Sequence, residues 1–342
     1  MLIAMQRNFS PLIVFFFLFS SAFAQDIPLF QTKEPINLRV TGSIKSIKKK
    51  SNDSAFVAGK FAYEQATDRW ISVPVKARVR GNFRLKNCYF PPLKLKLGKK
   101  DVASTLFAGN KALKLVLPCR TSSDKNNLIR KEYLCYQFYQ VVSTYFFRTR
   151  LAHLELTENS KSKARKYDLL AFFVEDNSLV AKRSEGKVVE TKGISPAMFD
   201  EKQSIRNDFF QYMIGNADWS AIFQHNSNTL FVGGKYVPLS YDFDMSGFVN
   251  AGYAQQNAPT LGTGDVRERV YRGFCKSKPA MEEIRKEFLV KESAIAAIIN
   301  QEASNFSKYE LNDMHSYIDG FFDILKKDQW FQESILDQCR TK

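Results

Sequence analysis

Five segments of alternating apolar residues between Ile36 and Leu117 constrain the fold most. They are rich in β-branched and aromatic residues, and turn-forming clusters separate them, which predicts the strands of an antiparallel meander. We expect these strands at 36–47, 55–63, 70–83, 93–97 and 113–117. The first third of the chain is therefore expected to be a sheet rather than a helical bundle.

The hydrophobic period changes after this sheet. Apolar residues recur at helical spacing from Leu128 to Phe146 and again between Pro196 and Gly215. A strand pair is expected at 150–157 and 167–174, and everything beyond Lys278 reads as helical. We therefore expect an α+β chain, with a β-rich N-terminal lobe containing one long helix at 25–175 and a mostly helical C-terminal lobe at 176–342.

The first 24 residues have the layout of a secretory signal peptide. Arg7 precedes an apolar run from Leu12 to Phe19, and Ala22-Phe23-Ala24 fits a small-x-small cleavage site. The apolar run is shorter than the roughly 20 residues that a membrane-spanning helix needs. We expect an exported protein, periplasmic or extracellular, with no membrane span after cleavage.

The chain is basic, with a formal net charge of +15 over 342 residues. Removing residues 1–24 takes away one positive charge and leaves +14. A basic balance favours anionic partners. Because the basic residues are spread along the chain, we expect no nucleic-acid partner; an acceptor protein or an anionic ligand of the cell envelope fits better.

Five cysteines and three histidines occur in the sequence, and no CxxC motif is among them. A structural zinc site is therefore not expected. Disulfides are permitted in an exported protein. Cys88 and Cys119 lie just outside strand-like stretches and are expected to pair across a sheet, whereas Cys275 and Cys339 are expected to link the late helices. Cys135 lies on an apolar helix face and is expected to be a buried thiol.

A polar hairpin is the strongest functional signal. The segments Asn228–Val232 and Tyr236–Leu239 flank Gly233-Gly234, which predicts a β-hairpin. Asn226 precedes the first strand and Asp242 follows the second, so strands about 4.8 Å apart place this amide and this carboxylate beside one ion. Such oxygen ligands suit Mg²⁺.

Asp218 lies on the loop upstream of this hairpin, where it is placed to act as a base. A base, an Asn and an Asp together form the working arrangement of phosphoryl transfer. The run Gly215-Asn216-Ala217-Asp218-Trp219-Ser220, then His225-Asn226, then Tyr241-Asp242-Phe243-Asp244, resembles the catalytic core of the CotH-type spore-coat kinases. Arg80-Gly81-Asn82, Pro91–Leu97 and Leu128–Glu132 resemble further parts of that family.

The resemblance implies a two-lobed protein-kinase-like fold with an antiparallel β-rich N-terminal lobe and a mostly helical C-terminal lobe. It also implies Mg²⁺ and a nucleotide such as ATP as cofactors. The roles it implies are catalytic for Asp218, metal-binding for Asn226 and Asp242, and cofactor-binding for the remaining matched positions, which are Lys94 or Lys96, Glu132 and Arg80. Asp244 and His225 belong to the same block. No GxGxxG loop occurs, and Arg80-Gly81-Asn82 is the candidate in its place.

Several alternatives stay open on sequence alone. Asp218, Asp242 and Asp244 also fit simple turn caps. Arg267 and Arg269 fit either a solvated helix face or an anion-binding edge. Two functions remain: an exported atypical kinase-like protein that transfers phosphoryl groups to an envelope or secreted acceptor with Mg²⁺, or a non-catalytic envelope protein that binds an anionic ligand in the same cleft.

Overall fold

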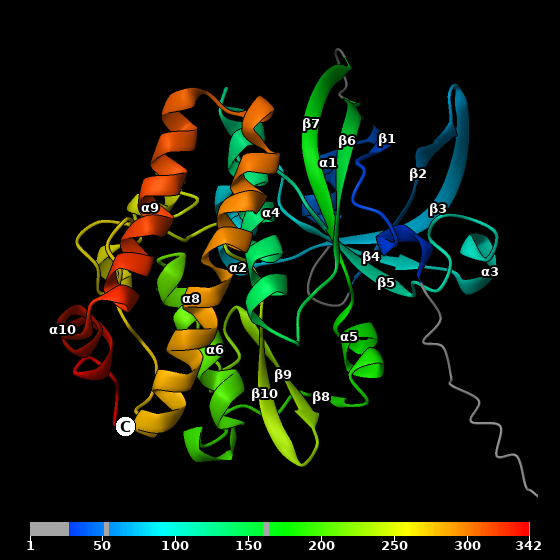
Figure 1. Ribbon diagram of the computed structural model, residues 1–342. Helices are drawn as coiled ribbons and strands as arrows, with labels where there is room; N and C mark the ends of the chain where they lie inside the picture. The colour runs from blue at the N-terminus through cyan, green and yellow to red at the C-terminus, as the bar shows by residue number, and fades with distance from the viewer. Residues whose placement is uncertain (1–26, 51–54, 160–163, 342) are drawn as a thin grey trace, which may run out of the picture.

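The structure is a computed structural model that describes residues 27–50, 55–159 and 164–341. The predicted signal peptide, residues 1–24, lies outside the described residues. Within the described ranges, no helix is both long enough and apolar enough to cross a membrane. The described chain consists of a β-barrel beside a helical region that carries a small second sheet (Figure 1).

Seven strands form the barrel, in the order β1-β2-β3-β4-β5-β7-β6. Neighbours pair antiparallel from β1 to β5, and β7 joins β5 to β6 in the same way. The strands are β1 (Ile36–Gly42), β2 (Val57–Ala66), β3 (Arg69–Val79), β4 (Leu93–Leu97), β5 (Ala112–Val116), β6 (Thr149–Glu158) and β7 (Arg165–Val174).

The expected two-lobed protein-kinase-like fold with an antiparallel N-terminal lobe is wrong. β1 pairs parallel with β6, from Ile36 beside Ala152 to Gly42 beside Glu158, and this pairing closes the sheet into a mixed barrel. Closure removes the exposed edges that an open sheet would leave. The alternation of apolar residues could not predict it, because alternation defines the faces of a strand but not a partner more than a hundred residues away.

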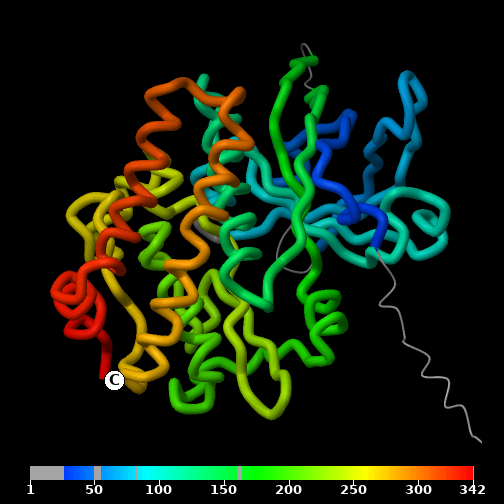
Figure 2. Tube along the Cα trace, viewed as in Figure 1, coloured from blue at the N-terminus to red at the C-terminus, as the bar shows by residue number. Residues whose placement is uncertain are grey.

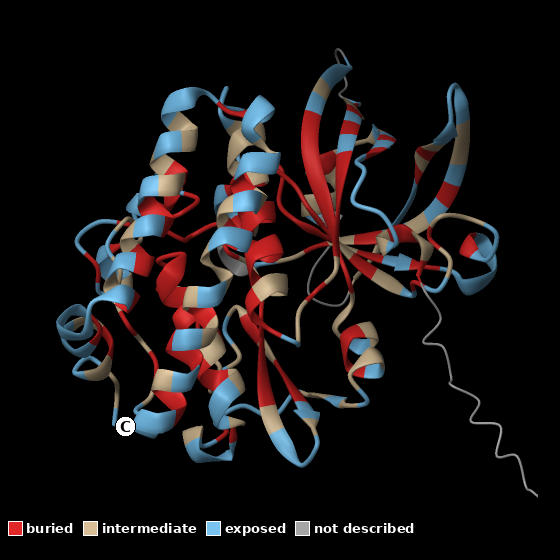
Figure 3. Cartoon of the chain, viewed as in Figure 1, coloured by how far each residue is buried: buried red, intermediate tan, exposed pale blue. Residues whose placement is uncertain are grey.

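Alternation does define the inside of the barrel. Leu93, Leu95 and Leu97 of β4 are buried in its core, together with aromatic side chains such as Phe61 and Phe173. Lys94 and Lys96 point to the opposite face of the same strand, because successive side chains of a strand alternate. Figure 3 shows buried residues along the strands and along the facing sides of the helices.

The helical region is built around a second apolar core. Its long helices are α4 (Lys125–Val142), α6 (Glu201–Met213), α8 (Lys278–Gln301) and α9 (Lys308–Lys326). α8 packs against α4, α6 and α9. In Figure 2 the chain runs from cyan-green at α4 through green at α6 to orange at α8 and red-orange at α9. The small sheet has the order β10-β9-β8 and consists of β8 (Lys187–Val189), β9 (Ser227–Val232) and β10 (Lys235–Ser240).

Short helices connect these parts: α1 (Ile44–Lys50), α2 (Asn82–Asn87), α3 (Lys99–Val102), α5 (Asn177–Arg183), α7 (Gly252–Gln255) and α10 (Asp328–Phe331). Two of them replace expected strand. The first strand stops at Gly42 rather than 47, and α1 follows. β3 stops at Val79 rather than 83, because Gly81 adopts a left-handed φ of +78° and turns the chain into α2.

Both predicted disulfides are confirmed. Cys88 and Cys119 are bonded with Cα atoms 4.5 Å apart, and Cys275 and Cys339 with Cα atoms 4.9 Å apart. Cys135 is a free, buried thiol, as expected. The first bridge fastens the end of α2 to the chain just after β5, which fixes α2 relative to the barrel.

Candidate functional site

The hairpin prediction is confirmed in its register. Ser227 of β9 lies opposite Ser240 of β10, and beyond this pair the Tyr241 N–H donates to the Asn226 carbonyl at 3.0 Å. Asn226 and Asp242 both adopt left-handed backbone conformations, with φ of +47° and +66°. Among non-glycine residues, Asn and Asp tolerate this region best. The two side chains therefore leave adjacent strand ends toward the same space.

That space is a cavity of about 100 Å³ between the barrel and the small sheet. Since a water molecule takes about 30 Å³ of liquid volume, the cavity has room for a group the size of a phosphate. Its residues come from the β3–α2 turn, α2, the residue before β4, β5, α4 and the two ends of the hairpin: Arg80, Gly81, Arg84, Pro92, Lys114, Val116, Tyr136, Asn226, Tyr241 and Asp242. We call this cavity the hairpin pocket.

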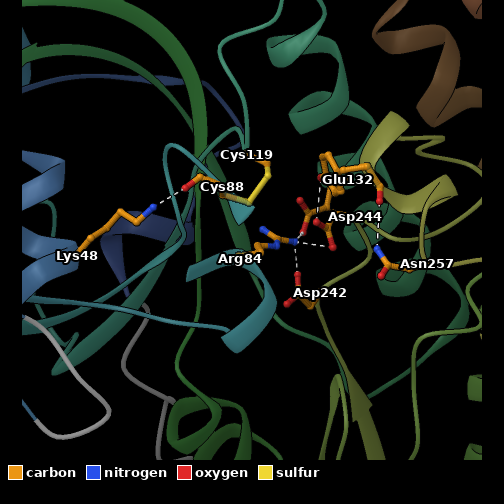
Figure 4. Close-up of a disulfide and its surroundings, with 9 residues drawn as sticks. Lys48, Arg84, Cys88, Cys119, Glu132, Asp242, Asp244 and Asn257 are labelled. Atoms are coloured by element: carbon orange, nitrogen blue, oxygen red, sulfur yellow. Dashed lines mark hydrogen bonds and ion pairs between the residues drawn. A yellow bond between two sulfur atoms is a disulfide. The ribbon is translucent and has the colours of Figure 1, made fainter. Parts of the chain in front are cut away.

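Arg84 of α2 is the centre of the charged contacts beside the pocket. Its Nη2 lies 2.7 Å from Oδ1 of Asp244 and 3.4 Å from Oε1 of Glu132, and it also contacts Oδ1 of Asp242. Figure 4 shows these three carboxylates converging on the one guanidinium. Arg84, Glu132 and Asp244 are buried. The cluster is thus a desolvated network in which one cation holds three acidic side chains.

Burial and mutual repulsion shape the titration of this cluster. The pKa of Glu132 is raised to about 8: burial is the largest cause, Arg84 acts against it, and the neighbouring Asp244 and Asp242 add to it. Burial also raises the pKa of Asp244. The pKa of Arg84 lies well above its ordinary value because the three carboxylates outweigh its own burial. Arg84 therefore stays charged, while Glu132 holds a proton at neutral pH.

Lys114 of β5 contributes a second buried cation. The residue as a whole is half-buried, but its ammonium nitrogen is buried and has no hydrogen-bond partner among the described residues. The nitrogen lies 3.9 Å from the ring centroid of Tyr241 and 4.6 Å from that of Phe147. Burial, and secondly Arg80, lower the pKa of Lys114 well below its ordinary value. An ammonium buried without a hydrogen-bond partner is costly even beside aromatic rings, so this one points to an anionic ligand that would accept its hydrogen bonds.

The loop that carries Asp218 starts where α6 ends. Gly215 has a φ of +62°, and a Cβ atom there would lie 1.9 Å from the Tyr317 hydroxyl, so glycine is required. The Asn216 side chain then accepts from the Asp218 N–H at 3.0 Å and donates to the Gln211 side chain at 2.9 Å. These contacts hold the Asp218 backbone at the rim of the small sheet.

Each carboxylate oxygen of Asp218 has a hydrogen-bond partner. Its Oδ1 lies 2.7 Å from His225 Nε2, and its Oδ2 accepts from Asn226 Nδ2 at 2.9 Å. The hydrogen bond to Asp218 raises the pKa of His225 above its ordinary value. Because Asn226 lines the hairpin pocket, this Asp–His–Asn network lies directly beside it. The chemistry available here is proton acceptance at the pocket rim.

Not every predicted site residue reaches the pocket. Arg80, Asn226 and Asp242 line it, whereas Asp218 adjoins it through Asn226. Lys94 pairs across strands with Lys114 but does not line the pocket, and neither does Lys96. Lys96 is exposed, with its nitrogen 4.3 Å from the ring centroid of Phe56.

Three other predicted residues have partners different from those expected. Glu132 pairs with Arg84 instead of a strand lysine. Arg267 forms an ion pair with Asp313 at 2.7 Å, and Arg269 stacks over the Tyr317 ring at 3.8 Å. Residues 265–273 are not helical, so Arg267 and Arg269 are packing residues rather than a solvated helix face or a free anion-binding edge.

Sequence analysis missed Arg84, Lys114 and Tyr136. The Asp242 N–H donates to the Tyr136 hydroxyl at 3.0 Å, which helps to fix Asp242 in its left-handed conformation. Lys114 occupies an apolar-Lys-apolar stretch like that of Lys94 and Lys96, so the sequence held a signal for it as a third strand lysine. Arg84 had no signal, because it was next to an expected strand end.

One of the residues expected to hold Mg²⁺ already has a cation as its partner. Asp242 is ion-paired with Arg84 through Oδ1, whereas Asn226 donates to Asp218 through its amide nitrogen. Among the residues that the structure describes, no group of three or more His, Cys, Asp or Glu side chains has the arrangement of a metal site. Positively charged Arg84 occupies the place where the acidic side chains converge.

No protein-family model matches this chain, and a search among curated proteins finds no similar sequence. The function therefore has to be inferred from the chemistry of the hairpin pocket itself.

Proposed function

We propose that the hairpin pocket binds the phosphate group of an anionic ligand, such as a nucleotide or a phosphorylated envelope component. The observation that carries this proposal is the buried ammonium of Lys114, which has no hydrogen-bond partner among the described residues. Three cationic side chains line the pocket, namely Arg80, Arg84 and Lys114, against the single carboxylate of Asp242. An oxyanion would satisfy Lys114 and remove the cost of its burial.

The size of the pocket supports a phosphate rather than a whole nucleotide inside it. A volume of about 100 Å³ is below the range of about 300–1,000 Å³ typical of pockets that enclose drug-sized ligands. The rest of a larger ligand would extend along the surface outside. A neutral ligand would leave Lys114 unpaired, so charge is the first requirement for recognition.

Phosphoryl transfer is a second candidate, and the network around Asp218 favours it. Asp218, His225 and Asn226 are joined by hydrogen bonds of 2.7 and 2.9 Å beside the pocket, where a base would meet an acceptor hydroxyl. The likeness of this block to the CotH-type kinases supports the same reaction class. An envelope or secreted protein is the acceptor that we propose for such a transfer.

We also propose that the protein works outside the cytoplasm, in the periplasm or beyond the cell. Two disulfides support this, because thiols are kept reduced in most cytoplasmic proteins. The pattern of residues 1–24 is that of an export signal.

Ligand binding by the purified chain tests the proposed function. Melting temperature is measured with pyrophosphate, ATP and adenosine, because a ligand that binds only the folded state raises it. We expect pyrophosphate and ATP to raise the melting temperature and adenosine to leave it unchanged. No shift with any phosphate compound would contradict phosphate binding. Transfer is then tested with labelled ATP, where loss of label transfer in Asp218→Asn with retained ATP binding would support the second candidate.

A further inference from the structure

Arg84 occupies the position at which a divalent cation would bridge the acidic side chains of this site. We propose that the hairpin pocket takes its phosphate group as a free anion, with the Arg84 guanidinium in place of a metal ion. This inference rests on the phosphate-binding function proposed above. It specifies the ionic form of the ligand.

The contacts of one nitrogen atom carry the inference. Nη2 of Arg84 contacts carboxylate oxygens of Glu132, Asp242 and Asp244 together. Because these three oxygens surround a single point, a divalent ion cannot bridge them at that point without expelling the guanidinium. Expulsion would leave a buried arginine unpaired, which is strongly unfavourable.

The backbone also holds Arg84 in place. The Arg84 carbonyl accepts from the Cys88 N–H at 2.9 Å, and Cys88 is bonded to Cys119. The Tyr89 N–H donates to the Cys119 carbonyl at 2.7 Å, so the bridge is backed by a backbone contact. Lys48 adds a third restraint through a 2.7 Å hydrogen bond to the Cys88 carbonyl (Figure 4). α2 is therefore fastened at its end rather than free to swing Arg84 outward.

The charges of the residues that line the pocket also favour a free anion. Asp242 is the only carboxylate among the lining residues, and Arg84 already pairs with it. The charges left for a ligand are those of Arg80 and Lys114, both positive. A metal-chelated phosphate carries less negative charge than the free anion, and it adds a cation beside two others. The free anion is consequently the better electrostatic match.

Calorimetric titration of the full folded chain tests this inference with two probes, pyrophosphate and ATP. Each is titrated in excess EDTA and again in excess MgCl₂. We expect the dissociation constant in EDTA to equal or lie below that in MgCl₂. Binding that needs MgCl₂, or tightens with it by about tenfold or more, a difference of about 1.4 kcal/mol, would overturn the inference while leaving phosphate binding in place. No binding in either buffer would instead overturn the proposed function and this inference with it.

Asp242→Asn provides a second test that distinguishes binding of the free anion from binding through a metal ion. Asn tolerates the left-handed φ of +66° at this position and keeps the backbone contact to Tyr136. If Asp242 served a metal, this change would weaken binding by about tenfold or more, since Mg²⁺ sites rest on one or two carboxylates. With Arg84 as the resident cation, removal of the only lining carboxylate should leave affinity unchanged or raise it. A large loss in a variant with a normal melting curve would contradict the inference.

Asp313→Asn provides the matched control for this substitution. Asp313 pairs with Arg267 away from the pocket and is similarly part-buried. The control should leave both dissociation constants unchanged.

Discussion

The ammonium nitrogen of Lys114 lies 3.9 Å from the centroid of the Tyr241 ring. This contact joins β5 of the barrel to the residue that follows β10 of the small sheet. It places a buried cation at the wall of the hairpin pocket, which Asn226 of the Asp218–His225–Asn226 network also lines. In the function that we propose, the barrel would supply the charge for ligand binding, and the hairpin would supply the groups that act on the ligand.

The Cys88–Cys119 disulfide is expected to support the pocket as well as the fold. Replacing both cysteines by Ala should lower the free energy of unfolding by about 3–4 kcal/mol, the loop-closure effect for a separation of 31 residues. It should also weaken pyrophosphate binding, because α2 and Arg84 lose their anchor. Urea unfolding and calorimetry measure the two effects.

The second disulfide is the control for the first. Replacing Cys275 and Cys339 by Ala should cost about 4 kcal/mol by the same relation, for a separation of 64 residues. This bridge joins the chain ahead of α8 to the C-terminal end, away from the pocket residues. Pyrophosphate affinity should therefore stay unchanged, and equal losses of affinity in both double variants would show that neither bridge positions the pocket.

Arg84→Met is expected to destabilise the fold by about 3–5 kcal/mol at neutral pH, because Asp244 loses its buried counter-ion. Without Arg84 the Asp244 carboxyl group holds its proton to higher pH, so the free energy difference from wild type should shrink as the pH falls toward 5. Urea unfolding at several pH values measures it. Arg130→Met, which breaks a single pair with Glu302 away from the pocket, should cost less.

The pKa of His225 is expected to lie above its ordinary value of 6.5 because its ring is hydrogen-bonded to Asp218. NMR titration of the ring protons measures this directly, since only three histidines occur in the chain. Asp218→Asn should lower the pKa of His225, because the hydrogen bond to a carboxylate is lost. An unchanged His225 titration in the variant would show that the contact does not persist in solution.

Asp208 gives a pH dependence from the helical region. Burial raises its pKa to about 7, well above the ordinary 3.8. Between these values the unfolded chain has lost this proton and the folded chain has kept it, so raising the pH favours unfolding. Asp208→Asn removes that effect. The free energy of unfolding of the variant, relative to that of wild type, should therefore increase as the pH rises from 4 to 7. At 1.36 kcal/mol per pKa unit, this increase amounts to about 4 kcal/mol at most. A constant difference across this range would contradict the assignment.

Local features of the fold could be predicted from the sequence because their signals are local. β4 (Leu93–Leu97) follows a strict alternation, and Gly233-Gly234 defines the β9–β10 turn within a few residues. The disulfides followed from the positions of the cysteines beside expected elements. Asn226 and Asp242 came together because a hairpin fixes the register of its own ends.

Contacts between residues far apart in the chain could not be predicted from the sequence. The parallel contact of β1 with β6 closes the barrel, and no local pattern at Ile36 indicates Ala152 as its partner. The same limit applied to Arg84, whose three acidic partners lie 48 to 160 positions further along the chain. The prediction of Mg²⁺ beside Asp242 rested on carboxylates that are visible in the sequence, whereas their pairing with Arg84 became visible only in the structure.

Lys114→Met tests the central claim, that a buried cation of the barrel binds the phosphate group of the ligand. Met keeps the length of the side chain and removes the charge, so the melting temperature should stay level or rise as an unpaired buried ammonium is lost. Lys94→Met, on the neighbouring strand and outside the pocket lining, is the matched control. In calorimetric titrations with pyrophosphate we expect Lys114→Met to weaken binding by about tenfold or more, about 1.4 kcal/mol, and Lys94→Met to bind as wild type does. Wild-type affinity in Lys114→Met, or an equal loss in both variants, would contradict the claim.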